Sequence, residues 1–255
     1  MDDIEIETVA SVDPTDPVLV EGLPGVGHVG KLAADQILEE FEEGCTLVRR
    51  IYSSDLPPQV AVEDGVATLT ATDIYHVEPP TGRELLVVTG DHQAQSPPGH
   101  YRVTEAILDV AQELECAELY ALGGVPTGEL IEEYDVVGAV GDASEKEPLE
   151  AAGVEFREKE PAGGIVGVSG LLVGLGTRRD MTAACLMGET SGYLVDPKSA
   201  RAVLEVLEEL LGFELAYESL DDRAERMEEV VAKIREIEGG QPMEAPTDED
   251  LRYFG

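Results

Sequence analysis

Three glycines and a lysine near the start of the chain have the spacing of a phosphate-binding turn. Residues 22–35 are GLPGVGHVGKLAAD, in which Gly25, Gly27 and Gly30 match the glycine fingerprint of dinucleotide-binding folds. The stretch from Gly25 to Lys31 also matches most of a P-loop. Both motifs bind phosphate through backbone N–H groups at the start of a helix. Nucleotide chemistry is therefore the first hypothesis that this turn raises.

Neither motif is complete. A P-loop needs Ser or Thr directly after its lysine to bind magnesium, and Leu32 stands there. A dinucleotide site needs an acid at the end of the next strand, and the nearest one, Asp55, comes late, in a predicted loop. We therefore interpret the glycines as a tight turn that lets a strand and a helix pack closely. A ligand pocket between residues 25–31 and Asp91 is the alternative.

The other reactive side chains form no catalytic set in the sequence. His92 and His100 flank a loop beside Asp91, which would suit a metal or acid–base site, but the histidines lack metal-ligand spacing. Ser169 is not a nucleophile elbow, because the glycine after it comes one residue too early. Arg178, Arg179 and Asp180 form a compact basic cluster that predicts a structural salt bridge. We expect no catalytic residue, metal or cofactor.

The sequence ends with two adjacent aromatic residues, Tyr253 and Phe254, followed by Gly255. Residues 239–255 contain several acids and two prolines and have little to bury, which predicts a disordered tail. Two rings can fill a pocket while a terminal carboxylate meets a cation. We therefore predict that these three residues bind a partner. The alternative is a tail that folds back on its own domain.

The charge of the chain excludes some classes of partner. There are 17 basic and 54 acidic residues, a formal net charge of −37, and this acid repels nucleic-acid backbones. Acid spread along a whole folded domain is typical of a halophile. No apolar run is long enough to cross a membrane, and no secretory signal is visible. Cys45, Cys116 and Cys185 have no paired spacing, which indicates buried thiols in the cytoplasm.

Apolar periodicity predicts strands that alternate with helices. Predicted strands occupy residues 17–21, 46–53, 84–91, 117–125, 135–142 and 182–190, with a hairpin around Asp64-Gly65 within 59–78. Helices are predicted at 29–41, at 101–115 and from Asp196-Pro197 onward. The apolar segment 162–181 is of unclear type. This order favours an α/β layered domain with a largely parallel sheet plus an antiparallel hairpin.

The chain is predicted to have three parts. Residues 1–215 form the α/β core domain, 216–238 a C-terminal helical extension, and 239–255 the flexible acidic tail. The extension carries a heptad-like apolar seam that would pack on a neighbouring helix or subunit, made of Leu220, Ala224, Met227, Val231 and Ile234.

Three stretches resemble the proteasome assembly chaperone family, in its archaeal branch. They are GLPGVGHVGKLAADQILEEF at 22–41, LLVVTGDHQAQSPPGHYRVTEAILDVAQEL at 85–114 and ELYALGGVPTGEL at 118–130. The resemblance covers about residues 17–238. It implies a three-layer α/β/α fold with a mixed sheet, similar to the phosphorylase/hydrolase-like folds. It also implies a homo-oligomer that binds proteasome α subunits or the 20S core particle without catalysis.

The resemblance extends to the end of the chain. Partners of this kind dock through a C-terminal motif of a hydrophobic residue, a tyrosine and any residue. Tyr253 matches the first position and Gly255 the last, while Phe254 replaces the tyrosine and lacks its hydroxyl, at a cost of about 1 kcal/mol. We therefore predict a cytoplasmic, non-enzymatic chaperone or activator that docks through its tail. The alternative is a ligand-binding protein or enzyme that uses the glycine turn.

Overall fold

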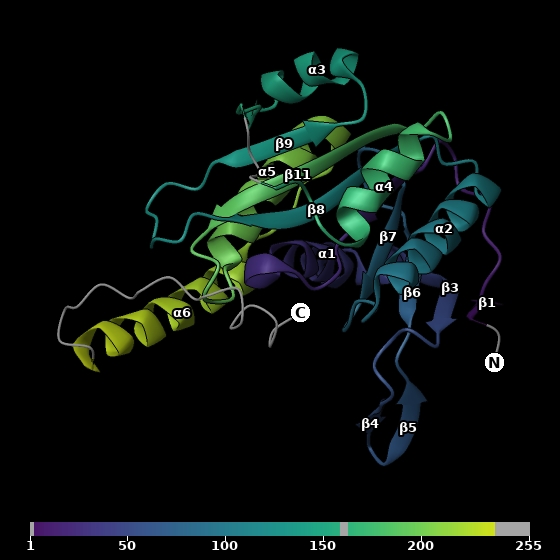
Figure 1. Cartoon of the computed structure of the whole chain (residues 1–255), viewed down its shortest axis with the longest axis horizontal. Coiled ribbons are helices and arrows are strands. Elements are labelled where there is room, and N and C mark those ends of the chain that lie inside the picture. The colour runs from purple at the N-terminus through teal and green to yellow at the C-terminus, as the bar shows by residue number, and fades with distance from the viewer. Residues whose placement is uncertain (1–2, 159–162, 238–255) are drawn as a thin grey trace.

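The computed structural model describes residues 3–158 and 163–237 (Figure 1). Their strands are β1 (Ile4–Thr8), β2 (Val18–Glu21), β3 (Cys45–Ser53), β4 (Val60–Glu63), β5 (Val66–Leu69), β6 (Thr72–Val77), β7 (Leu85–Gly90), β8 (Glu118–Pro126), β9 (Val136–Val140), β10 (Val154–Glu155) and β11 (Thr182–Thr190). Their helices are α1 (Val29–Glu40), α2 (Pro97–Glu113), α3 (Lys146–Ala151), α4 (Val168–Thr177), α5 (Pro197–Leu211) and α6 (Glu218–Ile237). None of these helices is both long and apolar enough to span a bilayer.

Nine of the strands form one mixed sheet in the order β1-β3-β6-β7-β2-β8-β11-β9-β10. Strands β7, β2, β8 and β11 are parallel to one another and form its centre. Antiparallel pairs flank this centre on both sides. The mixed sheet is therefore as predicted, although half of its eight strand pairings are antiparallel, more than expected. Its parallel part is the central region that leads into the glycine turn.

Helices cover both faces of the sheet, which confirms the three-layer α/β/α fold. Helices α1 and α5 pack on one face and α2 and α4 on the other (Figure 1). The central strands are buried on both sides because successive side chains point to opposite faces. Val20 of β2, for example, faces α1 and α5, while Leu19 faces α2 and α4. A strand buried in this way needs continuous apolar sequence, as residues 18–20 have.

Two helices begin at caps that the sequence contains. The Asp196 carboxylate accepts the Ser199 N–H at 3.1 Å and Pro197 is the first residue of α5, as predicted. Helix α2 uses the same device: Ser96 Oγ accepts the Gly99 N–H at 3.0 Å. This helix therefore begins at Pro97, four residues before the predicted start, because the Ser-Pro cap extends it beyond its apolar stripe.

The predicted hairpin is present as strands β4 and β5. Asp64 and Gly65 both have positive φ, at 49° and 82°, as a tight two-residue hairpin turn requires. The apolar segment whose type the sequence left open contains helix α4. Its short run of small and apolar residues has no clear period because both the sheet and α2 lie against it. Strand β1, which was not predicted, pairs antiparallel with β3.

Candidate functional site

The glycine turn connects β2, in the centre of the parallel strands, to helix α1. Strand β2 ends at Glu21 and α1 begins at Val29. Gly27 and His28 have left-handed backbone, with φ of 62° and 52°, and this reverses the chain within the turn. In α/β sheets, ligands bind beside the carboxyl ends of such strands. The turn is therefore in a suitable place for a site, and its surroundings decide what it can bind.

Close packing explains most of the glycines in this stretch. A Cβ on Gly30 would lie 2.9 Å from the carbonyl carbon of Leu122 in β8, and one on Gly22 would lie 2.6 Å from the Ala34 Cβ. A Cβ on Gly27 would lie 2.9 Å from Thr190 Oγ1. The interpretation as a packing turn is therefore confirmed at these three glycines. Gly25 differs, because a Cβ there would meet no described atom within 4 Å.

Two acids surround the lysine of the turn. Lys31 Nζ lies 2.6 Å from Asp35 Oδ1 and 3.8 Å from Asp91 Oδ1, so the fold does bring the turn and Asp91 together. These carboxylates neutralise the lysine that the motif would offer to a phosphate, and their own charge repels an anion. The pairing also answers why a cation is tolerated at a helix N-terminus. The local electrostatics therefore favour a structural role for Lys31.

Backbone groups of the turn are bonded to neighbouring loops. The Gly27 carbonyl accepts the Asp196 N–H at 2.8 Å, at the start of α5. The Pro24 carbonyl accepts Gln93 Nε2 at 2.7 Å, from the loop after β7. Within the turn, the His28 N–H donates to the Gly25 carbonyl at 3.0 Å, so this donor is not available to a phosphate. The turn thus links β2 to the loop after β7 and to the start of α5, at the carboxyl ends of the central strands.

We expect ATP and NAD to leave the melting temperature of this protein unchanged in molar salt. The acids around Lys31 are the reason, because they disfavour a bound phosphate. A ligand at about 100 times its Kd would add about 2.7 kcal/mol and raise Tm by several degrees. Differential scanning fluorimetry measures this. A rise that disappears in Lys31→Ala would establish the ligand pocket at the turn.

A buried carboxyl group lies at the carboxyl end of β2, and no sequence motif indicates it. Glu21, the last residue of β2, is fully buried, and its Oε1 accepts the Leu23 N–H at 3.0 Å. Its Oε2 has no hydrogen-bond partner among the described residues. Burial raises the pKa of Glu21 to about 7, although the Leu23 N–H and the nearby Ser169 side chain favour the charged form. The sequence signal for this buried carboxyl is an acid at the end of a continuous apolar strand.

Glu21 shares its side of the sheet with a cysteine. Glu21 is paired with Ala121, and Ala121 with Cys185, so the three lie in one row across β2, β8 and β11. Burial raises the pKa of the Cys185 thiol, and the Glu21 carboxyl raises it further. This thiol is therefore protonated and unreactive. We therefore interpret Glu21 and Cys185 as buried polar residues of the core and not as a nucleophilic centre.

The remaining sequence candidates are held in structural contacts. Arg179 pairs with Glu105 and with Asp109, the latter at 2.7 Å, which confirms the predicted salt bridge. The His92 ring contacts Gln59, whereas at His100 it is the backbone carbonyl, within α2, that accepts the Thr104 hydroxyl at 2.8 Å. Within the described ranges, no three His, Cys, Asp or Glu side chains have the geometry of a metal site.

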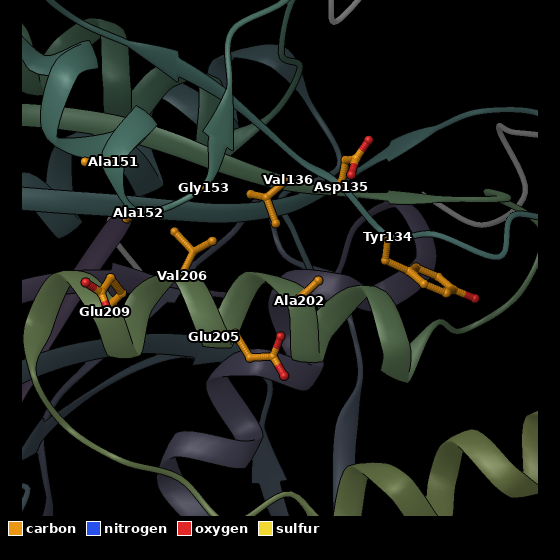
Figure 2. Close-up of a pocket in the computed structure, with 10 residues that line it drawn as sticks. All are labelled: Tyr134, Asp135, Val136, Ala151, Ala152, Gly153, Ala202, Glu205, Val206 and Glu209. Carbon is orange, nitrogen blue, oxygen red and sulfur yellow. The ribbon is translucent and has the colours of Figure 1, made fainter.

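An open groove of about 500 Å³ lies elsewhere, between β9 and α5 (Figure 2). Figure 2 shows Val136 from the strand and Val206 from the helix projecting into the same space, with Glu205 and Glu209 along α5. The described lining contains no serine, cysteine or histidine and none of the turn residues. Its described ionisable side chains are carboxylic acids and the phenol of Tyr134.

The predicted docking residues Tyr253, Phe254 and Gly255 lie outside the described residues, as does the whole 239–255 tail. Helix α6, which precedes them, is present, and Leu220 at the start of its predicted seam is buried against the α1/α5 core. The division of the chain at residues 215 and 238 remains a prediction.

Known proteins are similar to this chain in both sequence and fold. The sequence profile of the PAC2 family matches residues 19–235. A protein from Methanocaldococcus jannaschii is 38% identical over 253 residues, which is 97% of this chain and 96% of that protein. The crystal structure of Pyrococcus furiosus PbaB, an archaeal proteasome activator, is 34% identical with a TM-score of 0.86, covering 92% of this chain and 100% of that chain.

A second solved structure is similar over the same extent. Pyrococcus furiosus PbaA, an archaeal homolog of proteasome-assembly chaperone, is 26% identical with a TM-score of 0.75, covering 92% of this chain and 93% of that chain. The resemblance found in the glycine turn and the two later stretches is thus confirmed over nearly the full length. On the matched residues and the shared three-layer fold, the chain belongs to the PAC2 family.

Proposed function

We propose that this protein is a non-enzymatic, cytoplasmic proteasome-binding protein, either an assembly chaperone or an ATP-independent activator. The observation that carries the proposal is the similarity to PbaB, an archaeal proteasome activator, at 34% identity over 92% of this chain. The similarity to PbaA, a homolog of proteasome-assembly chaperone, supports it. The partner in this proposal is the ring of proteasome α subunits, free or in the 20S core particle.

The docking element in this proposal is the end of the chain. Tyr253 and Phe254 fill a pocket on the α ring, and the Gly255 carboxylate pairs with a lysine beside it. Phe254 provides the ring expected at its position without the hydroxyl. Each tail is then a weak anchor, and several tails on one homo-oligomer would raise the effective concentration of the others.

The start of α6 supports this arrangement, because it is firmly attached to the body. Arg201 of α5 lies 2.8 Å from Asp221, and Arg223 lies 2.8 Å from Glu39 of α1. The Gln36 side chain donates to the Ala216 carbonyl at 2.8 Å, just before the helix. Helix α6 then leads away from the sheet (Figure 1).

Because the net charge is −37, docking in this proposal depends on the salt concentration. At low salt the acidic body repels itself and any acidic partner, whereas salt at molar concentration screens charges beyond about 3 Å. We propose that the protein acts in such a saline cytoplasm. Apolar anchors such as Tyr253 and Phe254 then contribute more than surface ion pairs.

Deleting residues 253–255 is expected to weaken capture of the proteasome α ring by at least roughly tenfold, because it removes both rings and moves the carboxylate. The measurement is a pull-down in molar salt with purified α ring, wild type against the truncated chain. Sedimentation of both proteins checks that the oligomer is unchanged.

Three further variants separate the ring contacts from tail length. Tyr253→Ala and Phe254→Ala keep the length and should each weaken capture, whereas Thr247→Ala in the linker should not. Phe254→Tyr restores the hydroxyl and should tighten binding about fivefold, which corresponds to about 1 kcal/mol. Equal capture of the wild type and the truncated chain would exclude docking through the tail.

A further inference from the structure

Helix α4 is anchored by polar contacts more firmly at its C-terminal end than at its start. Just after the helix, Arg179 pairs with Asp109 at 2.7 Å and donates to the Gln112 side chain at 2.9 Å, both in the neighbouring α2 (Figure 1). At the start, the N-cap residue is Gly167, which has no side chain to cap the first turn. The first turn of α4 can therefore open while the other end stays in place.

The chain that leads into α4 can follow such a movement. Gly163, Gly164 and Gly167 all have positive φ, at 83°, 88° and 93°. A Cβ on Gly163 or on Gly164 would meet no described atom within 4 Å, so packing does not fix these two residues. Val166, before the last of the three, is 88% exposed. A few loop residues that can change φ and ψ freely are what a hinge requires.

A single glutamine side chain connects the first turn of α4 to the glycine turn. Gln93 Oε1 accepts the Val168 N–H at 3.4 Å, which is long, and Gln93 Nε2 donates to the Pro24 carbonyl at 2.7 Å. Residues 168–177 have no ionisable side chain, so no ion pair strengthens this contact. Val168 itself is fully buried in the core under α2. The closed first turn is therefore the major state, and an open one is a minor state.

The buried Glu21 carboxyl lies next to this first turn, beside Ser169. Its Oε1 accepts the Leu23 N–H, whereas its Oε2 has no hydrogen-bond partner in the described part of the chain. Burying an unpaired charge costs far more than burying a neutral group, so this place suits a carboxylic acid better than a carboxylate. Loss of the proton therefore favours any movement that brings water to Oε2. The first turn of α4 is the weakly held element beside it.

We propose that the first turn of α4, residues 168–171, is a proton-controlled switch, which is closed while Glu21 carries its proton and opens more often once Glu21 has lost it. Opening breaks the bond from the Leu171 N–H to the Gly167 carbonyl, which is 3.2 Å long in the closed form. It also separates Val168 from Gln93. Because Gln93 contacts the glycine turn as well, the opening reaches the carboxyl ends of the central strands.

The groups around Glu21 are apolar, neutral or paired elsewhere. Val88 of β7 and Ala121 of β8 flank it in the sheet, and Cys185 of β11 follows in the same row. The Cys185 thiol stays protonated because burial and Glu21 both raise its pKa. Polar groups of the loop after β7 and of α2 have partners of their own: Asp91 contacts Lys31, His92 contacts Gln59, Arg102 contacts Asp55, and Glu105 and Asp109 contact Arg179. A pH response of the first turn therefore comes from Glu21.

The test is native-state hydrogen exchange of the full chain in molar salt, measured by NMR at the Leu171 amide. The pKa of Glu21 is about 7 in the closed form and 4.5 when the carboxyl meets water. After correction for the intrinsic exchange rate, the open fraction should rise more than tenfold between about pH 5.5 and 7.5. In Glu21→Gln, which cannot ionise, it should not change with pH. Circular dichroism checks that this variant is folded.

Global unfolding also exposes Glu21, so the exchange is repeated at low concentrations of urea. Opening one helical turn exposes little surface and depends weakly on urea, whereas global unfolding depends on it strongly. Exchange at Leu171 should therefore depend weakly on urea, and exchange at Ile107, which is fully buried in α2, should depend on it strongly. Equal urea dependence at these two amides overturns the proposal. The same pH dependence in the wild type and in Glu21→Gln also overturns it.

Two further variants test the contacts at the two ends of α4 without changing Glu21. Gln93→Ala removes one hydrogen bond from the first turn and should raise the open fraction at Leu171 about fivefold at every pH, with its pH dependence unchanged. Gln112→Ala is the matched control, because it removes a contact of Arg179 at the anchored end and should leave Leu171 as in the wild type. An unchanged open fraction in Gln93→Ala contradicts the proposal. These measurements do not involve proteasome binding, so the two proposals can fail separately.

Discussion

Replacing Gly30 with alanine is expected to destabilise the protein by about 3 kcal/mol or more, the upper end of the cost of overpacking. The new Cβ would lie 2.9 Å from the carbonyl carbon of Leu122, and closer still to its oxygen. Leu122 pairs with Leu186 of β11, and the preceding residue, Ala121, pairs with Glu21 of β2, so the strand holds this carbonyl in place. Helix α1 would have to move instead, away from the core that it covers.

A competing effect has the opposite sign and is smaller. Alanine favours a helix over glycine by up to about 1 kcal/mol, and Gly30 lies in the first turn of α1. The steric clash with backbone exceeds this gain, so Gly30→Ala should lower Tm by roughly 6 °C or more. Thermal unfolding followed by circular dichroism in molar salt measures the change.

Gly25→Ala is the matched control in the same turn. Gly25 has extended backbone, with φ of −157°, and a Cβ there meets no described atom within 4 Å. We expect its stability to change by no more than about 0.5 kcal/mol. If Gly30→Ala unfolds at the same temperature as Gly25→Ala, close packing is not the reason for glycine at position 30.

Replacing Glu21 with glutamine is expected to stabilise the protein above pH 7 and to have little effect below pH 4.5. The pKa of Glu21 rises from 4.5 to about 7 on folding because the carboxyl is buried. Between these values the folded protein holds a proton that the unfolded chain has lost, so stability falls as pH rises. Above pH 7 the cost is constant, on the order of 3 kcal/mol.

Glutamine keeps the oxygen that accepts the Leu23 N–H and cannot ionise, so the variant lacks this cost. Because the chain has many other acids, the informative quantity is the difference in unfolding free energy between variant and wild type. Chemical denaturation at several pH values should show this difference growing from about pH 4.5 to 7. Glu147→Gln, at an exposed residue, removes the same charge and is the control. A difference that does not vary with pH would contradict a buried carboxyl with a raised pKa.

Local sequence patterns were sufficient to predict most of the secondary structure. The Asp64-Gly65 pair predicted the hairpin, and Asp196-Pro197 predicted the start of α5, because turns and caps depend on residues only a few positions apart. Segment 162–181 had no usable period, and its helix α4 forms only between α2 and the sheet. Strand β1 was missed because the charge of IEIET obscured its alternation.

By itself, the sequence determined the α/β class, the acidic composition and the glycine turn, and its resemblance to a known family implied the three layers. Only the tertiary structure decided what these features do, because that depends on contacts between segments far apart in the chain. The Leu122 backbone leaves no room for a side chain at Gly30, and Asp91 forms an ion pair with Lys31. Burial in the core raises the pKa of Glu21. The β4–β5 hairpin illustrates the same limit: its alternation predicts two strands, whereas only the structure shows that, among the described strands, they pair with each other and not with the main sheet.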